Sequence, residues 1–257
     1  MKEILKIEKL YKNYQTKKDE INVLNNINLL VNKGDFIGII GPSGSGKSTL
    51  LSIIANLEKE SSGIIKKDKD LKIGYMLQDD SLMPFLNILD NCLLGLKIKK
   101  IDTKENIENV KKMLEKYGLK EFMYNYPKDL SGGMRQRVAL IRTLAFKPDL
   151  ILLDEPFSRL DYQTRLSVSN DIFNILKDEN KTLIIVTHDI GEAISMCSKV
   201  IVLSNRPSKI KNIYDIKFNK TNNFIENRKD KDFMEYYTKI WGDLCYDEWE
   251  TNFFKEK

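Results

Sequence analysis

Apolar and polar residues alternate along the first 35 positions, which is the pattern of strands that bury one face. The alternation over Ile4–Ile7 and over Val23–Val31 predicts two antiparallel strands, with a polar turn at Asn13–Glu20. A continuous apolar run follows at Phe36–Ile40 and ends at Gly41. Because both faces of such a run are apolar, it predicts a buried strand of a mostly parallel sheet.

Beyond this strand, segments with helical spacing alternate with short apolar runs. Helical patterns cover 48–57, 107–117, 164–177, 191–196 and 233–244, and strand patterns cover 64–65, 73–77, 150–153, 183–187 and 200–203. Strands that alternate with helices indicate an α/β protein with a parallel sheet.

Helical patterns dominate the segment 79–145, which interrupts this alternation. We therefore expect an α/β fold in which an N-terminal antiparallel β subdomain precedes a parallel core, with an α-helical subdomain inserted at about 79–145. The predicted domain covers 4–230, and a helical tail covers 231–257. The composition becomes polar from Pro207 onward.

The composition is that of a globular chain that can bury a core, since 42% of the 257 residues are hydrophobic and 31% are charged. No apolar run reaches the roughly 18 residues of a membrane helix, and we expect no secretory signal. The three cysteines form no metal-binding pattern, which favours a reducing cytosolic compartment. The net charge of +5 raises the question of nucleic acid, but the scattered lysines indicate solvated surface.

The clearest motif is a phosphate-binding loop between a predicted strand and a predicted helix. The pattern G-x-x-x-x-G-K-[ST] is matched by Gly41, Pro42, Ser43, Gly44, Ser45, Gly46, Lys47 and Ser48. Glycines let backbone N–H groups turn toward phosphate oxygens, and the helix N-terminus adds its positive end. We expect Lys47 to reach the β- and γ-phosphates and the Ser48 hydroxyl to bind Mg²⁺.

A second motif ends the apolar run Leu150–Leu153 with two carboxylates, Asp154 and Glu155. The carboxyl end of a buried parallel strand lies at the sheet edge where ligands bind. Asp154 suits Mg²⁺ coordination, directly or through water, and Glu155 is the candidate general base or water-orienting residue. Two acids after an apolar run are, alone, weak evidence for a site of metal binding and hydrolysis. In a chain that also has a phosphate-binding loop, they become strong evidence for such a site.

A third motif, Ser131, Gly132 and Gly133, precedes the helical stretch 138–144. Backbone N–H groups, a hydroxyl donor and a helix dipole make it a second candidate anion site. By themselves, these residues are more simply an ordinary serine cap followed by glycines. Two anion sites in one chain suggest that each serves half of a shared nucleotide in a symmetric homodimer.

The phosphate-binding loop, Leu130–Gln136, Asp154-Glu155, Asp161 and His188 occur in an order that resembles ABC transporter ATP-binding subunits. The resemblance covers nearly the whole chain. It implies a P-loop NTPase core of the RecA-like type and hydrolysis of ATP with Mg²⁺.

The resemblance also implies roles for residues whose type alone does not indicate a function. Gln78 falls where the family senses Mg²⁺ and the membrane partner, and His188, the only histidine, falls where a strand-end histidine contacts the γ-phosphate. Tyr14 matches the aromatic residue that stacks on adenine, with Tyr11 as the alternative. The loop Ser158–Asp161 matches a segment that crosses the dimer interface. On residue type alone, Gln78 and Tyr14 are also ordinary surface residues.

Asp161 also suits a helix cap. The expected site residues fall into three groups by role. The expected ATP contacts are Tyr14, Gly41–Thr49, Gln78, Ser131, Gly132, Gly133 and Asp161, the expected Mg²⁺ contacts are Ser48, Gln78 and Asp154, and the expected catalytic residues are Lys47, Glu155 and His188.

A finer resemblance, carried by 78–85, 88–91, 157–165 and 203–207, is to the subgroup that imports nitrate, sulfonates, taurine and pyrimidine precursors of thiamin. It implies a peripheral protein on the cytoplasmic face of the cell membrane, which pairs with a permease and indirectly with an extracellular solute-binding protein. Arg159 departs from the pattern because a small residue is usual there, and Met134 replaces a commoner glutamine.

The alternative is a non-transport ABC ATPase that acts on nucleic acid or ribosomes, which the positive charge would suit. No coiled-coil heptads separate the two nucleotide motifs, and the chain carries one nucleotide-binding unit rather than two, so we expect no nucleic-acid partner. An exporter ATPase is disfavoured by the subgroup resemblance. The solute is not readable from a chain expected to contact the permease rather than the cargo.

Overall fold

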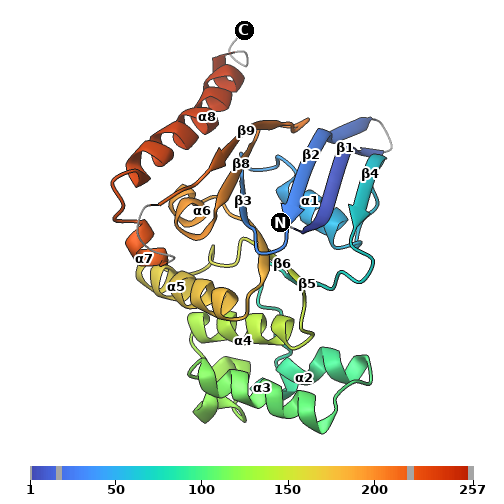
Figure 1. The fold of residues 1–257 in the computed structure, drawn as a ribbon, viewed down its shortest axis with the longest axis vertical. Coiled ribbons are helices and arrows are strands. Elements are labelled where there is room, and N and C mark those ends of the chain that lie inside the picture. Colours follow the sequence, from blue (N-terminus) through green and yellow to red (C-terminus); the bar gives the residue numbers. More distant parts are fainter. Residues whose placement is uncertain (1, 16–18, 219–222, 254–257) are drawn as a thin grey trace. The chain divides into compact units, whose positions relative to one another are not determined.

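The computed structural model describes residues 2–15, 19–218 and 223–253, so the turn predicted at Asn13–Glu20 lies partly outside the described residues (Figure 1). Its contacts divide the chain into two compact units. The first unit combines Met1–Leu71 with Thr182–Lys257, and the second is the continuous segment Lys72–Lys181. The domain boundaries expected at 4–230, 79–145 and 231–257 stay a prediction.

In the first unit, β1 (Glu3–Gln15) lies between β2 (Glu20–Asn32) and β4 (Ser62–Lys67) in an antiparallel sheet (Figure 1). The predicted alternation is visible at Leu5 and Ile7, which are both buried. The register then shifts between Ile7 and Leu10, where Lys9 takes φ 49°. This bulge keeps Leu10 buried although it breaks the two-residue period.

The same unit contains a mostly parallel group of strands. β3 (Phe36–Ile40) lies between β7 (Thr182–Val186) and β8 (Lys199–Leu203), parallel to both. All residues of β3 and β7 are buried, as the continuous apolar runs predict. Helix α6 (Ile190–Met196) packs on β3 at Gly38, where an added Cβ would lie 3.2 Å from the Ala193 Cβ.

Strand β9 (Ile210–Asp215), which pairs antiparallel with β8, is not among the predicted strands. Its residues are half-buried or exposed, so its sequence lacks the apolar run that marks the neighbouring strands. Other helices of this unit are α1 (Lys47–Ile54), α7 (Phe224–Asn227) and α8 (Phe233–Phe253), and α8 packs on α6.

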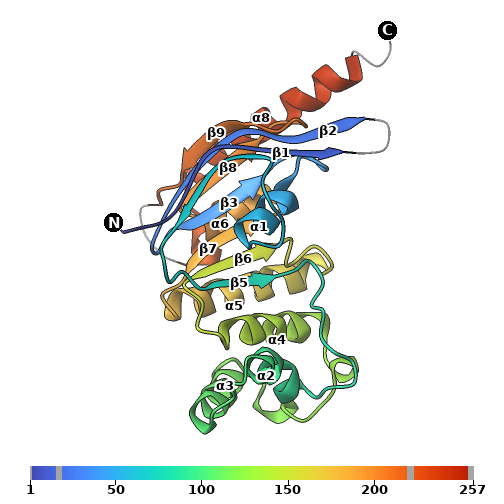
Figure 2. The ribbon, with the colours of Figure 1, turned by 90° about the vertical axis from the view of Figure 1, so that its right-hand side faces the viewer.

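The second unit contains two parallel strands, β5 (Ile73–Met76) and β6 (Leu150–Asp154), and four α-helices within its fully described span. The helices are α2 (Ile88–Ile98), α3 (Lys104–Lys116), α4 (Gly132–Leu144) and α5 (Tyr162–Asp178). Figure 2 shows α2, α3 and α4 packed together, and their apolar faces share one core. No helix in the described parts of the chain is long and apolar enough to span a bilayer.

Candidate nucleotide-binding and hydrolysis site

The phosphate-binding motif forms the loop between β3 and α1 in the first unit. Gly46, at φ 90°, is the residue before α1, and an added Cβ would lie 2.6 Å from Val23 Cγ1. Only glycine takes this conformation without steric cost. The motif therefore supplies the backbone shape that a phosphate cradle requires.

Lys47 opens α1 and is 7% exposed. Its Nζ donates hydrogen bonds to the carbonyl oxygens of Gly41 and Pro42, each at 2.9 Å. The cation is thereby held inside the loop, where the motif assigns it to phosphate oxygens. Ser45 is buried next to it, and its carbonyl oxygen accepts a hydrogen bond from the Ser208 hydroxyl.

Tyr14 lies near the end of β1, and the fold brings it to the helix that follows the phosphate-binding loop. Its hydroxyl donates to Glu58 Oε2 at 2.6 Å and contacts the Thr49 side chain. Burial, together with the hydrogen bond to Glu58, raises the pKa of the Tyr14 phenol. The expected adenine contact and the expected phosphate contact Thr49 are therefore neighbours in one unit.

His188 follows β7 and is exposed. The residues around it are fixed by side-chain hydrogen bonds. Thr187 donates to Glu192 Oε2 at 2.7 Å, and Asp189 caps α6 by accepting from the Glu192 N–H at 2.9 Å. The backbone at His188 is thus held between the end of a buried strand and the first turn of a helix.

Asp154 is the last residue of β6 in the second unit and is 7% exposed. Tyr75 donates a hydrogen bond from its hydroxyl to Asp154 Oδ2 at 3.1 Å. The parallel pairing of β5 with β6 produces this contact, since Tyr75 pairs with Leu152. Sequence reasoning did not single out Tyr75, because no local pattern connects residues 79 positions apart.

Glu155 takes φ 45°, a left-handed conformation that is uncommon for a residue with a Cβ. Its carbonyl oxygen accepts a hydrogen bond from the Ser158 hydroxyl at 3.0 Å, which holds the turn after β6. Strained backbone of this kind clusters at active sites. The conformation is compatible with the expected role of Glu155 as the base, which stays a prediction.

The Gln78 side chain also reaches this turn, because its Nε2 donates to the Ser158 Oγ at 3.4 Å. Next to it, Arg159 forms an ion pair with Asp79, with 2.5 Å between Nη2 and Oδ1. The arginine that departs from the family pattern thus pairs with an acid beside Gln78. The structure brings Gln78 and the Ser158–Asp161 loop together within one unit.

Ser131 caps α4 by accepting from the Met134 N–H at 3.3 Å. An added Cβ at Gly133 would lie 2.6 Å from Val168 Cγ2 on α5, so this glycine permits close packing of the two helices. Arg135 links the same helix end to the Gln78 loop through Asp80 at 3.0 Å. The ordinary serine cap is present, and it is compatible with anion binding.

Asp161 caps α5, where its Oδ1 accepts from the Thr164 N–H at 3.1 Å. Hydrogen bonds from the Thr164 side chain and backbone lower the pKa of this carboxyl. The helix-cap interpretation of Asp161 is therefore confirmed.

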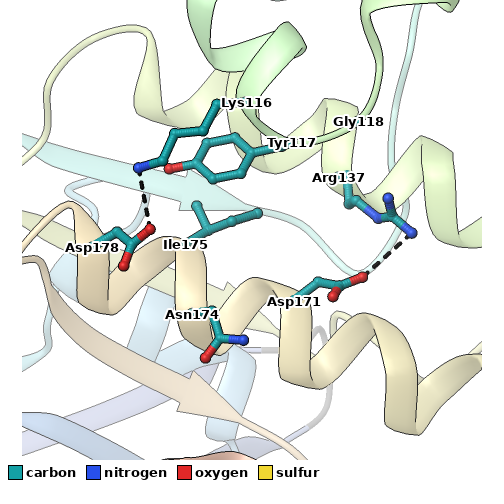
Figure 3. Close-up of a pocket in the computed structure, with 8 residues that line it drawn as sticks. All are labelled: Lys116, Tyr117, Gly118, Arg137, Asp171, Asn174, Ile175 and Asp178. Carbon is teal, nitrogen blue, oxygen red and sulfur yellow. Dashed lines mark ion pairs between the residues drawn. The ribbon is translucent and has the colours of Figure 1, made fainter.

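A separate cavity of about 370 Å³ lies between α3, α4 and α5 (Figure 3). Its charged groups pair with one another, Lys116 with Asp178 at 3.1 Å and Arg137 with Asp171 at 3.3 Å. None of the predicted site residues lines this cavity.

The candidate metal ligands Ser48, Gln78 and Asp154 offer hydroxyl, amide and carboxylate oxygens. Mg²⁺ prefers oxygen ligands, and it usually binds through one or two protein groups together with waters and substrate phosphates. Asp154 adds a buried carboxylate at a strand end. The chemistry of each donor is therefore suited to Mg²⁺, and the binding of one ion by all three residues stays a prediction.

Residues 24–158 match the family model described as ABC transporter. This chain belongs to the ABC transporter family. An uncharacterized ABC transporter ATP-binding protein of Bacillus subtilis is 43% identical over 93% of this chain and 95% of its own length. An aliphatic sulfonates import ATP-binding protein of Bacillus cereus is 36% identical over 93% of this chain and 95% of its own length. A nitrate import ATP-binding protein of Synechocystis is 37% identical over 80% of each chain.

Solved structures support the same assignment. A dimeric bacterial ABC transporter cassette has a TM-score of 0.71 at 32% identity, covering 83% of this chain and 99% of that one. A post-hydrolysis state of such a cassette, bound to ADP and Pi, has a TM-score of 0.69 at 31% identity with the same coverage. The chain is an ABC transporter ATP-binding subunit and an ATPase, and the predicted fold class is confirmed.

Proposed function

We propose that this ABC ATPase powers import of a small solute of the nitrate, sulfonate, taurine or pyrimidine type through a separate membrane permease. Two of the relatives are named as import ATP-binding proteins for sulfonates and nitrate, and each aligns with four fifths or more of this chain. The observation that carries the proposal is this similarity to import ATP-binding proteins along most of the chain.

The working assembly in this proposal is a homodimer of the chain bound to permease subunits at the cytoplasmic face of the membrane. Dimeric cassettes among the similar structures support the homodimer. An extracellular solute-binding protein would deliver the solute to the permease and would not contact this chain. Coupling requires the permease to bind the open and closed dimers with different affinities.

Nucleotide binding in this proposal begins with the first unit. Lys47 and the backbone of Gly41–Thr49 hold the phosphates, and Tyr14 stacks on adenine. Ser131, Gly132 and Gly133 of a second copy close over the γ-phosphate, which requires two chains for each site.

For hydrolysis, Glu155 accepts a proton from the attacking water, and His188 donates to the γ-phosphate. Mg²⁺ held by Ser48, Gln78 and Asp154 would neutralise developing charge on the phosphate oxygens. Gln78 also contacts the permease side of the assembly, and Asp161 belongs to the loop that meets the second copy.

The test is ATP hydrolysis by the reconstituted complex. The tagged chain is purified with its permease, placed in liposomes with the solute-binding protein, and assayed for phosphate release with nitrate, taurine, an alkanesulfonate and a hydroxymethylpyrimidine. We expect one solute class to stimulate hydrolysis several-fold, with Glu155→Gln as the inactive control. Stimulation by DNA or ribosomes instead of any solute would contradict the proposal.

A further inference from the structure

Two charged side chains hold the Tyr14 ring at its edge and on one face. The Tyr14 hydroxyl donates to Glu58 Oε2 at 2.6 Å. Lys12 pairs with the other oxygen of the same carboxylate, with 3.0 Å between Nζ and Oε1. The Lys12 Nζ also lies 4.5 Å from the centre of the Tyr14 ring. The three groups therefore contact one another around one aromatic ring, and the Thr49 side chain also contacts the Tyr14 hydroxyl.

This arrangement is anchored on two segments of the first unit. Lys12 comes from β1 and donates to the Lys59 carbonyl oxygen at 2.8 Å, while Glu58 lies on the segment that follows α1. The Lys12 side chain is 12% exposed and that of Glu58 is 29% exposed. Partial burial of this kind makes the ion pair stronger than a fully solvated one.

The charge states of Glu58 and Tyr14 agree with these contacts. The hydrogen bond from Tyr14 and the contact with Lys12 lower the pKa of the Glu58 carboxyl. Burial, together with the hydrogen bond to Glu58, raises the pKa of the Tyr14 phenol, so the ring remains neutral. A cation within about 6 Å of an aromatic ring is attracted to its face. A base that stacks on this ring must therefore use the face opposite Lys12.

We propose that Lys12 and Glu58 are positioning residues that fix the Tyr14 ring for stacking with adenine on the face opposite Lys12. The inference rests on the proposed role of Tyr14. A ring that is already fixed loses little rotational freedom when the base binds, so its stacking contributes more to affinity.

The experiment compares a ligand that carries the base with one that lacks it. Binding of ADP and of inorganic tripolyphosphate is measured by calorimetry for the purified chain and for Tyr14→Ala, Glu58→Ala and Lys12→Ala. We expect Tyr14→Ala to weaken ADP binding about 5- to 100-fold, the range for loss of one aromatic stack. Glu58→Ala and Lys12→Ala should weaken it about 3- to 10-fold, and tripolyphosphate binding should stay unchanged in all three.

A double-mutant cycle tests whether Glu58 acts through the Tyr14 hydroxyl. Tyr14→Phe keeps the ring and removes the hydrogen bond, so Glu58→Ala in the Tyr14→Phe background should have a smaller effect than in the wild type. Glu58→Gln keeps an oxygen that accepts from Tyr14, and it should restore part of the affinity. In steady-state hydrolysis, Glu58→Ala should raise KM for ATP and leave kcat unchanged.

The matched control is the ion pair Lys6–Glu8, which lies on the same strand with 2.7 Å between Nζ and Oε1. Lys6→Ala and Glu8→Ala should leave ADP binding unchanged. If Tyr14→Ala weakens ADP binding but Lys12→Ala and Glu58→Ala do not, the inference fails and the proposed function stands. Equal losses for ADP and tripolyphosphate, or additive effects in the cycle, also overturn it. A wild-type chain that binds no ADP would contradict the proposed function itself.

Discussion

At Glu155 the backbone takes φ 45°, a conformation that costs a residue with a Cβ about 1–2 kcal/mol. The neighbouring groups impose it, since Asp154 is buried at the end of β6 and the Ser158 hydroxyl holds the Glu155 carbonyl oxygen. Strained backbone of this kind often occurs at active sites, although Lys9 and Asn56 of this chain take positive φ as well, so the role of Glu155 stays a prediction.

The first prediction separates strain from chemistry at Glu155. Glu155→Gly should raise Tm by about 2–4 °C, because glycine takes positive φ without steric cost. Glu155→Gln should leave Tm unchanged, retain ATP binding, and lower the rate of phosphate release at least about 100-fold, as expected for loss of a general base. Hydrolysis at the wild-type rate in Glu155→Gln would refute the role assigned to Glu155.

The second prediction concerns Lys47, whose ammonium is held by the loop carbonyls of Gly41 and Pro42. Lys47→Ala should weaken ATP binding about 10- to 100-fold, because charge-assisted hydrogen bonds to phosphate are lost. Lys33→Ala, at an exposed lysine just before β3, is the control and should bind ATP normally. Calorimetric titration measures both, and equal affinities would contradict the prediction.

At the scale of elements, the helices of the second unit begin at side-chain caps. Asn87, Thr103, Ser131 and Asp161 each accept a backbone N–H in the first turn of α2, α3, α4 and α5. Such caps stabilise helices by about 1 kcal/mol each. These helix starts are therefore fixed locally, and two of them carry residues expected to bind nucleotide.

The third prediction concerns Asn91, a fully buried amide on α2. Its Nδ2 donates to the carbonyl oxygens of Met83, Leu86 and Asn87, and its Oδ1 accepts from the Met83 N–H at 2.7 Å. Asn91→Leu removes the side-chain partner of the Met83 N–H and of the Leu86 carbonyl oxygen, whereas backbone N–H groups still reach the Met83 and Asn87 carbonyl oxygens, and it should lower the free energy of unfolding by about 2–4 kcal/mol.

The control for Asn91 is a half-buried asparagine on α3. Asn106 donates to the Ile101 carbonyl oxygen at 2.8 Å in a hydrogen bond that is open to solvent, so Asn106→Leu should cost less than about 0.5 kcal/mol. Urea denaturation measures both variants. Similar losses at Asn91 and Asn106 would show that the loop 83–87 does not depend on Asn91.

At the scale of the whole molecule, the contacts divide the chain so that the phosphate-binding loop lies in one unit and the segment Ser131–Gly133 lies in the other. Each motif is complete within its own unit. An oligomer that shares nucleotide between copies needs both motifs, one from each chain. Dimerisation should therefore depend on nucleotide and on Ser131.

The fourth prediction follows from this arrangement. Glu155→Gln should dimerise when ATP is added, as measured by light scattering after size-exclusion chromatography. Adding Ser131→Arg should abolish the dimer, because the larger side chain occupies the place of the phosphate. Ser62→Arg, on the exposed strand β4, is the control and should still dimerise. A dimer that forms equally well without ATP would contradict the proposed assembly.

The sequence by itself predicted the features whose determinants are contiguous. The antiparallel β1 and β2, the buried β3 and the helix after the phosphate-binding loop follow from apolar periodicity and one motif, since each depends on neighbours along the chain. Strand β9 was missed because pairing with β8, rather than an apolar run, makes it a strand.

Only the tertiary structure decided which distant side chains meet. Tyr14 and Glu58 are 44 residues apart, and Asp79 and Arg159 come from loops that follow different strands. Strand register and side-chain reach determine these contacts, and neither is encoded in a local pattern. The sequence identified the residues suited to nucleotide chemistry, whereas the fold supplied the groups that hold them in place, because a hydrogen bond requires proximity in space rather than along the chain.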